Sequence, residues 1–385
     1  MRNLIYRRII CTFLAIITVM LNVCAEAGAV KENKELLFCE VLIEAGSGTV
    51  IEGVNEEMPV PVGTMAKLMT VLLAAEKVER GELSLEDKLK TSSFANSMQG
   101  AQVWLMPGEE IIVSELFKSV IIGNANDAAA VLAEEISGSA EKFAALMNER
   151  AAELGMKNTA FTNFNGYYDD SEQISTAKDV AILCAKLAEY DFLKEYFTCW
   201  RDLVRNGETE LVNANTLVKS YKGIAGFKAG YTESSGYCVA AGAERDGVMY
   251  ISVVLGSDDE DLAFSEAKRL MNMGFSGYTV FVPELPGQLP AAIPVRGGMV
   301  REVPLEYGNV RSVVLPNGAV DSVSSRVVIT DYVYAPVKKG DKVGEIQFLR
   351  GDKMMFASDI CAADSAEKIT VPKALVIIIK KLLTF

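Results

Sequence analysis

Apolar and polar positions change their spacing several times along this chain of 385 residues, and the changes predict its elements. Residues 36–55 alternate around a Gly-Ser-Gly turn, which predicts a β-hairpin. Apolar residues then recur at the spacing of a helix face in four segments, residues 64–81, 113–122, 126–136 and 139–155. We therefore expect the chain to be mainly helical from residue 64 to about residue 195.

A second strand region follows the helical one. Residues 236–244 and 248–257 are two apolar runs joined by the turn Arg245-Asp246-Gly247, which indicates a strand, a hairpin turn and a strand. Both runs are apolar enough to lie inside a sheet, and residues 260–276 return to a helical pattern. A sheet with helices before and after it predicts an α+β domain, which we place at residues 33–280.

The remainder of the chain has a different pattern. Residues 281–298 hold four of the eleven prolines and predict a linker or an irregular start to a new unit. Residues 299–362 contain short strand-like runs separated by turn residues, so we predict a small all-β domain over residues 281–364.

The last segment, residues 366–385, has its apolar residues on one helical face, and its lysines are at positions 373, 380 and 381. The helix is too short to span a bilayer, so we expect it to lie on an anionic membrane surface. The alternative is a helix that docks on the body of the protein.

The N-terminus has the pattern of a secretory signal. Three arginines precede an apolar run at residues 9–23, and Ala25-Glu26-Ala27 offers a small-residue cleavage site. We predict a signal peptide at residues 1–27 and a protein secreted to the outer face of the cytoplasmic membrane. An uncleaved membrane anchor is the alternative.

Composition excludes several function classes. The formal net charge is −13 and the body of the chain has no basic run, so we expect no nucleic-acid partner. There is no histidine, which excludes the Ser-His-Asp triad and the histidine metal motifs, and we expect neither a metal nor a cofactor. A general base must be Lys, Asp, Glu, Tyr or a water chain. The two tryptophans, Trp104 and Trp200, are expected to be packing anchors.

One pair of residues offers a nucleophile and a base. Thr64 and Lys67 are three positions apart in a helical pattern, so their side chains share a face. A lysine can activate a hydroxyl when its amine is neutral, and burial or a second cation lowers its pKa toward that state. A hydroxyl and a lysine at this spacing also occur in helices by chance, so the pair alone does not decide between catalysis and ordinary helix composition.

Two further motifs give this pair a context. The segments IIGNANDAAAVLAEE and GIAGFKAGYTESSGY, with Asn124-Ala125-Asn126 and Lys228-Ala229-Gly230, resemble motifs of the low-molecular-mass penicillin-binding proteins, the serine-type D-Ala-D-Ala carboxypeptidase family. The similarity runs from residue 33 to the end of the chain. It implies a β-lactamase/transpeptidase-like domain, an antiparallel sheet with flanking helices and a helical subdomain, followed by the small all-β domain. It also implies a peptidoglycan stem peptide ending in D-Ala-D-Ala as the substrate, possible β-lactam binding, and a C-terminal membrane-associating helix.

The resemblance assigns a role to each matching residue. Thr64 takes the place of the nucleophile that forms an acyl-enzyme, and Lys67 takes the place of its base. Asn124 takes the position of a proton-relay serine, and Asn126 the position of the amide that orients the substrate. The resemblance assigns substrate binding to the β-strand residues Lys228, Ala229, Gly230 and Thr232. Lys228 would bind the terminal carboxylate and help to lower the pKa of Lys67. The oxyanion hole would come from the backbone N–H groups of Thr64 and a residue near Thr232.

All three motif hydroxyls differ from the family pattern. Threonine replaces serine at position 64, asparagine replaces serine at position 124, and alanine replaces threonine at position 229. A β-methyl restricts the nucleophile, an amide does not relay a proton, and loss of one preorganised donor can cost about 10²–10³ in rate. Two functions therefore stay open: a D-Ala-D-Ala carboxypeptidase that acts through Thr64, and a silent relative that binds muropeptides or serves as a scaffold in cell-wall or sporulation assembly.

Overall fold

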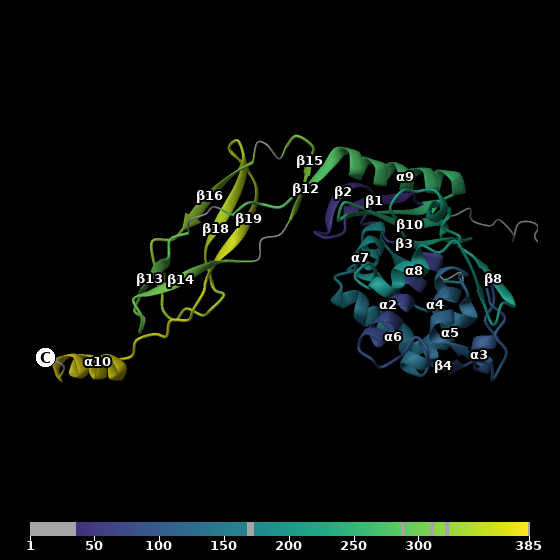
Figure 1. Ribbon diagram of the computed structural model, residues 1–385, viewed down its shortest axis with the longest axis horizontal. Helices are drawn as coiled ribbons and strands as arrows, with labels where there is room; N and C mark the ends of the chain where they lie inside the picture. Colours follow the sequence, from purple (N-terminus) through teal and green to yellow (C-terminus); the bar gives the residue numbers. More distant parts are fainter. Residues whose placement is uncertain (1–35, 168–172, 286–288, 309–311, 320–322, 384–385) are drawn as a thin grey trace, which may run out of the picture. The chain divides into compact units, whose positions relative to one another are not determined.

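The computed structural model describes residues 36–167, 173–285, 289–308, 312–319 and 323–383 (Figure 1). The predicted signal peptide lies outside the described residues. Within the part that is described, one α+β region is followed by a region of β-strands and a final helix.

An antiparallel sheet of five strands organises the first region, in the order β2-β1-β11-β10-β9. Its members are β1 (Cys39–Glu44), β2 (Thr49–Val54), β9 (Ile224–Thr232), β10 (Gly236–Arg245) and β11 (Val248–Ser257). The hairpins β1–β2 and β10–β11 confirm both hairpin predictions. Strand β9 lies at one edge of this sheet, so one side of its backbone is available to groups outside the sheet.

Helices cover both faces of the sheet (Figure 1). One face carries α9 (Glu260–Gly277). The other carries a helical group that contains α2 (Ala66–Glu79), α4 (Val113–Ile121), α5 (Asn126–Ser137), α6 (Ala140–Glu153) and α7 (Ala177–Leu187). The short helical turns are η1 (Gly63–Met65), α3 (Ser93–Asn96), η2 (Asp191–Leu193), α8 (Lys194–Phe197) and η3 (Thr216–Lys219). The predicted helices at 64–81, 113–122, 126–136, 139–155 and 260–276 are confirmed within a few residues.

Strand β11 shows why these strands are apolar along their whole length. Ile251 and Val253 are fully buried in the cluster on the side of the helical group. Tyr250 and Val254 are buried in the cluster on the side of α9. Because successive side chains of a strand point to opposite faces, a sheet covered on both faces needs apolar residues at nearly every position.

Three short strand pairs join the helical group. They are β3 (Val60–Pro61) with β6 (Ile174–Ser175), β4 (Lys88–Lys90) with β5 (Glu110–Ile112), and β7 (Arg201–Val204) with β8 (Thr209–Val212). The β7–β8 turn has left-handed backbone at Arg205 and Asn206, with φ of 56° at both. This geometry is that of a tight hairpin turn.

The C-terminal β region contains a six-stranded sheet in the order β16-β18-β19-β14-β13-β17. Its strands are β13 (Ala292–Arg296), β14 (Glu302–Tyr307), β16 (Val323–Ile329), β17 (Val333–Tyr334), β18 (Lys342–Arg350) and β19 (Lys353–Ala362), and β12 (Tyr278–Phe281) pairs with β15 (Val313–Pro316). A core of its own, with Ile346, Phe348 and Ile360 at its centre, holds this sheet together. The proline-rich segment is only partly a linker, because β13 lies inside it.

The last element among the described residues is α10 (Val371–Leu383). This helix of 13 residues falls within the segment that was predicted to be helical. Among the described residues, no helix has both the length and the apolar character needed to cross a membrane.

Candidate active site

Thr64 lies in η1, immediately before α2, and touches the edge strand β9. A Cβ atom added to Gly230 would lie 2.3 Å from the Thr64 hydroxyl oxygen, so only glycine leaves room for this hydroxyl beside the strand. Gly63 has a left-handed φ of 45°, and a Cβ there would lie 2.5 Å from the Ser235 hydroxyl oxygen. Two glycines therefore bring η1 and β9 together with Thr64 between them.

Lys67 is the buried amine next to this hydroxyl in the chain. It lies in the first turn of α2, is 1% exposed, and donates a hydrogen bond from Nζ to the backbone oxygen of Asn165 at 2.6 Å. Burial lowers the pKa of Lys67 to about 7. A lysine with that pKa is neutral in about half of the molecules at pH 7, which is the state a general base needs.

Lys228 points from β9 to the end of α4. It is 2% exposed and donates from Nζ to the carbonyl oxygens of Val120, at 2.8 Å, and Ile121, at 3.4 Å. Burial and repulsion from Lys67 lower the pKa of Lys228 well below its ordinary value. Burial, one of the two causes expected for Lys67, lowers its pKa, and the repulsion between the two amines contributes to the lowered pKa of Lys228.

Strained backbone precedes Lys228. Gly226 and Phe227 have φ of 93° and 87°, in the left-handed region that a bulky side chain rarely adopts. A Cβ on Gly226 would lie 2.1 Å from the carbonyl oxygen of Phe197, so glycine is required there. The Phe227 ring packs on Phe197, with the ring centroids 5.3 Å apart. This irregularity lets two consecutive side chains, Phe227 and Lys228, enter the helical side of the sheet.

The two asparagines lie at the start of α5. Asn124 has φ of 55°, a conformation that asparagine tolerates, and its Nδ2 donates to the backbone oxygen of Ala229 at 3.2 Å. The Asn126 Nδ2 donates to the backbone oxygen of Gln99 at 2.6 Å. The structure thus joins the second motif to the third through the Asn124–Ala229 bond.

Ala229 and Thr232 have different positions on β9. The Ala229 side chain is 4% exposed and is one of the buried residues in the cluster on the side of α9. Ala229 contacts the second motif through its backbone oxygen, which accepts the hydrogen bond from Asn124. Thr232 lies at the end of β9, half-buried, and its hydroxyl is 2.7 Å from that of Ser235.

Three buried oxygen atoms of these motifs lack hydrogen bonds. They are the Thr64 hydroxyl oxygen, the Asn124 Oδ1 and the Asn126 Oδ1, and none has a partner among the described residues. Buried polar atoms are nearly always paired, so a group of unpaired ones at one place needs an explanation. A bound substrate with amide N–H groups would supply the missing partners.

The segment at residues 163–167 belongs to the site and was not predicted from the sequence. The Asn165 backbone oxygen accepts from Lys67, and the Phe164 backbone oxygen accepts from the buried Thr70 hydroxyl at 2.7 Å. A Cβ on Gly166 would lie 1.7 Å from the Gly63 backbone oxygen, so this segment touches η1 as well. The run Asn163-Phe164-Asn165-Gly166 predicts a turn, but it does not predict where the turn packs.

Trp104 is not a packing anchor, because its side chain is 68% exposed. Its backbone is left-handed, with φ of 63°, in a loop whose neighbouring residues are buried. The prediction for this tryptophan was wrong, since the apolar residues on either side of it, Val103 and Leu105, fill the core instead.

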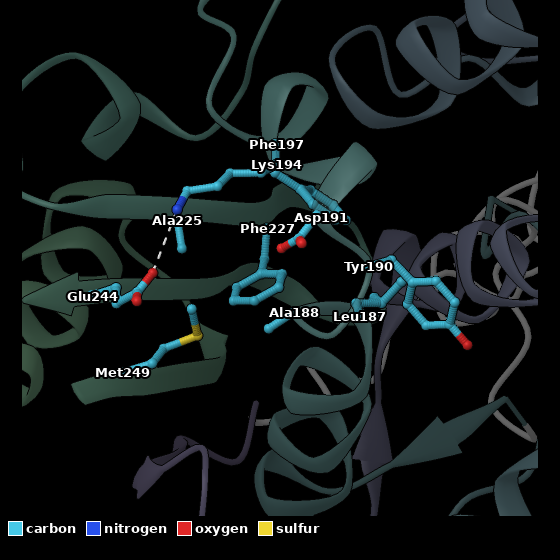
Figure 2. A pocket seen from close by; sticks show the side chains of 10 residues that line it. All are labelled: Leu187, Ala188, Tyr190, Asp191, Lys194, Phe197, Ala225, Phe227, Glu244 and Met249. Carbon is cyan, nitrogen blue, oxygen red and sulfur yellow. Dashed lines mark hydrogen bonds and ion pairs between the residues drawn. The ribbon is translucent and has the colours of Figure 1, made fainter. Parts of the chain in front are cut away.

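A pocket next to the start of β9 is separate from these motifs. Figure 2 shows that its lining includes Phe227 and both partners of the ion pair between Lys194 and Glu244, whose charged atoms are 3.4 Å apart. None of the eight residues predicted for the site lines it. Of its lining residues, Phe227 directly precedes Lys228 in the chain.

Comparison with known proteins finds a matching family model for each of the two regions of the chain. A family model described as D-alanyl-D-alanine carboxypeptidase matches residues 38–259, and a model of the penicillin-binding protein 5 C-terminal domain matches residues 286–368. The chain is 31% identical over 332 residues to the D-alanyl-D-alanine carboxypeptidase DacF of Bacillus subtilis, with 85% of each chain covered. It is 30% identical over 336 residues to DacC of Escherichia coli, covering 85% of this chain and 84% of that protein.

Solved structures agree on the fold. Penicillin-binding protein 5 of Haemophilus influenzae matches with a TM-score of 0.79 at 24% identity, covering 88% of this chain and all of that one. Penicillin-binding protein D2 of Listeria monocytogenes, solved in a cefotaxime-bound form, matches with a TM-score of 0.57 at 28% identity, over 62% of this chain and 96% of that one. The chain has the transpeptidase-like α+β fold with a C-terminal all-β domain, and it belongs to the D-alanyl-D-alanine carboxypeptidase family of low-molecular-mass penicillin-binding proteins.

Proposed function

We propose that this protein is a peptidoglycan D-alanyl-D-alanine carboxypeptidase that removes the terminal D-Ala of stem peptides through an acyl-enzyme at Thr64. The observation that carries the proposal is the combination of a hydroxyl that has no hydrogen-bond partner among the described residues and a buried lysine of low pKa within one helical turn of it. The curated relatives with 30% and 31% identity are named D-alanyl-D-alanine carboxypeptidases, which supports the same reaction.

The reaction follows from these groups. Neutral Lys67 accepts the Thr64 proton as the hydroxyl oxygen bonds to the carbonyl carbon of the penultimate D-Ala. The C–N bond to the terminal D-Ala then breaks, its nitrogen takes a proton, and free D-Ala leaves. Water attacks the resulting ester and releases the shortened peptide from Thr64. We assign the oxyanion to the backbone N–H groups of Thr64 and Thr232.

Substrate binding would use the remaining motif residues. The unpaired Asn126 Oδ1 accepts a substrate amide N–H, while its Nδ2 stays bonded to the loop. Lys228 supplies the positive charge for the terminal carboxylate when it is protonated, because its burial beside the site strengthens that attraction. β-Lactams mimic the same peptide end, and the Listeria relative was solved in cefotaxime- and ampicillin-bound forms.

A fluorescent penicillin and a D-Ala-D-Ala peptide test the proposal directly. The native protein should be labelled and should release D-Ala, and Thr64→Ala should do neither. Thr64→Ser should be acylated about tenfold faster, because removing the β-methyl lowers the barrier by an amount on the order of 1.4 kcal/mol. If the Thr64→Ser variant is labelled and the native protein is not, turnover by the native protein is refuted. The result would then favour a silent member of the family that binds muropeptides without cleaving them.

We also propose that α10 holds the protein to the outer face of the cytoplasmic membrane after secretion. Val371, Leu375 and Ile379 are 85%, 58% and 46% exposed, which leaves apolar surface for a lipid interface. Flotation with vesicles containing anionic lipid should recover the mature protein and should not recover a variant that ends at residue 368. N-terminal sequencing of the exported protein tests cleavage near Ala27.

A further inference from the structure

A loop that holds Asn126 is itself held by a residue far from the three motifs. The site loop (residues 99–109) lies between α3 and β5 and contains the exposed Trp104. Its first part bonds to Asn126 twice: the Asn126 N–H donates to the Ala101 backbone oxygen at 2.7 Å, and Nδ2 donates to the Gln99 backbone oxygen at 2.6 Å. The orientation of the Asn126 amide therefore depends on where this loop lies.

The second part of the loop bonds to the residue after Asn126. The backbone N–H groups of Val103 and Leu105 donate to the Asp127 carboxylate at 3.2 Å and 3.1 Å. Asp127 is 1% exposed, so these bonds are shielded from water. Trp104 lies between the two donors, and its indole is displayed on the surface.

Arg205 fastens the outer side of the same loop. Its guanidinium donates to both carboxylate oxygens of Glu109, from Nε at 2.7 Å and from Nη2 at 3.0 Å, and Nη1 donates to the Val103 backbone oxygen at 3.1 Å. The side chains of Arg205 and Glu109 are only 16% and 24% exposed, so solvent screens this pair less than a surface pair. Burial is the largest single influence on Glu109 and opposes its ionisation, but the hydrogen bond and charge of Arg205, together with the backbone N–H of Met106, outweigh burial and lower the pKa of that carboxyl.

The hairpin that carries Arg205 is a rigid support. Its backbone N–H at Arg205 donates to the Glu115 carboxylate at 3.1 Å, and Asp202 pairs with Lys118 at 2.7 Å. Glu115 and Lys118 both belong to α4, the helix whose last carbonyl groups accept the hydrogen bonds from Lys228. The left-handed φ of 56° at Arg205 is held by these contacts.

We propose that Arg205 is a positioning residue for substrate binding: it clamps the site loop through Glu109 and Val103, and the loop in turn holds the Asn126 amide that receives the substrate. The proposal rests on the proposed function for the role of Asn126. It assigns Arg205 no contact with the substrate. Loss of the clamp should therefore weaken binding of the peptide and leave the chemical step largely intact.

The chain has only two tryptophans, so the clamp can be observed without catalysis. In a Trp200→Phe background, Trp104 is the single fluorophore and reports the mobility of the site loop. Arg205→Ala should lower its fluorescence anisotropy, and Arg205→Lys, which keeps the charge but not the forked donors, should give a smaller decrease. Arg201→Ala is the matched control, because Arg201 lies on the same hairpin and its ion pair within the described part of the chain is with Glu210 of that hairpin, at 3.4 Å.

Binding and turnover complete the test. Arg205→Ala should raise the Kd and KM for a D-Ala-D-Ala peptide about tenfold and change kcat less than twofold, while Arg201→Ala changes neither. If Arg205→Ala does not fold, Glu109→Gln removes the same pairing and should show the same pattern. Unchanged Trp104 anisotropy, or a mobile loop with unchanged peptide Kd, would overturn the proposal. If the native protein binds no peptide, the proposed function fails, and the Trp104 measurement still decides whether the clamp exists.

Discussion

The rate of acylation at Thr64 should depend steeply on pH between 6 and 8. Only neutral Lys67 can accept the hydroxyl proton, and burial lowers the pKa of Lys67 to about 7. The neutral fraction is then about one tenth at pH 6 and about nine tenths at pH 8, so the rate should rise about tenfold across this range. An exposed lysine, with a pKa of about 10.4, would give a rise that continues past pH 9.

The assay is the second-order rate constant for labelling by a fluorescent penicillin, measured on the intact secreted protein from pH 5.5 to pH 9. Lys228 is the second buried amine of the site, and its own pKa is lowered by burial and by repulsion from Lys67. Loss of the Lys228 charge as the pH rises should weaken binding of the penicillin carboxylate. This effect on binding can be separated from the acylation step by comparing the labelling rate at saturating penicillin with the rate well below saturation. A profile without a rise between pH 6 and pH 8 would refute Lys67 as the general base.

Three substitutions test the packing around the site. Gly230→Ala should abolish labelling while thermal unfolding stays cooperative, because the new Cβ would lie 2.3 Å from the Thr64 hydroxyl oxygen; labelling at the native rate would contradict this. Thr70→Val should lower the free energy of unfolding in urea by about 1–3 kcal/mol, because the buried Phe164 carbonyl loses its donor. Asn124→Ser should slow labelling and destabilise the protein by about 1 kcal/mol, because the bond to the Ala229 oxygen is lost and serine tolerates φ of 55° less well. A faster rate in that variant would show that Asn124 obstructs the site.

The sequence predicts the fold well because burial leaves a pattern in it. The residues of β11 are apolar at almost every position since both faces of the sheet are covered, and α6 shows the spacing of a helix with one buried face. Strand β13 was missed because proline residues at 290 and 294 resemble a linker. Trp104 was misjudged because a side chain held out on a loop has no periodic neighbours that reveal its exposure.

The site was predictable only in part, for a physical reason. The motifs around Thr64, Asn126 and Lys228 can be found because each is a short local pattern. The contacts that set their chemistry are long-range: Lys67 and Asn165 are 98 positions apart, and Arg205 and Val103 are 102 positions apart. Both acceptors are backbone carbonyl oxygens, which every residue has, so the identity of the residue carries no signal.

Two of the three altered hydroxyl positions lie in contact, because the Asn124 side chain bonds to the backbone of Ala229. A serine side chain at position 124 is shorter than asparagine, and the Asn124 amide spans the gap from the start of α5 to the backbone oxygen of Ala229. Ala229 directs its methyl group into the apolar cluster on the side of α9, where a hydroxyl would need a partner of its own. The Asn124 amide thus bonds the start of α5 to a backbone oxygen of β9 that any residue at position 229 would offer, and alanine at 229 leaves no hydroxyl unpaired in the apolar cluster. Thr64 is the remaining change, and under the proposed function it is the one that alters the residue carrying the reacting oxygen.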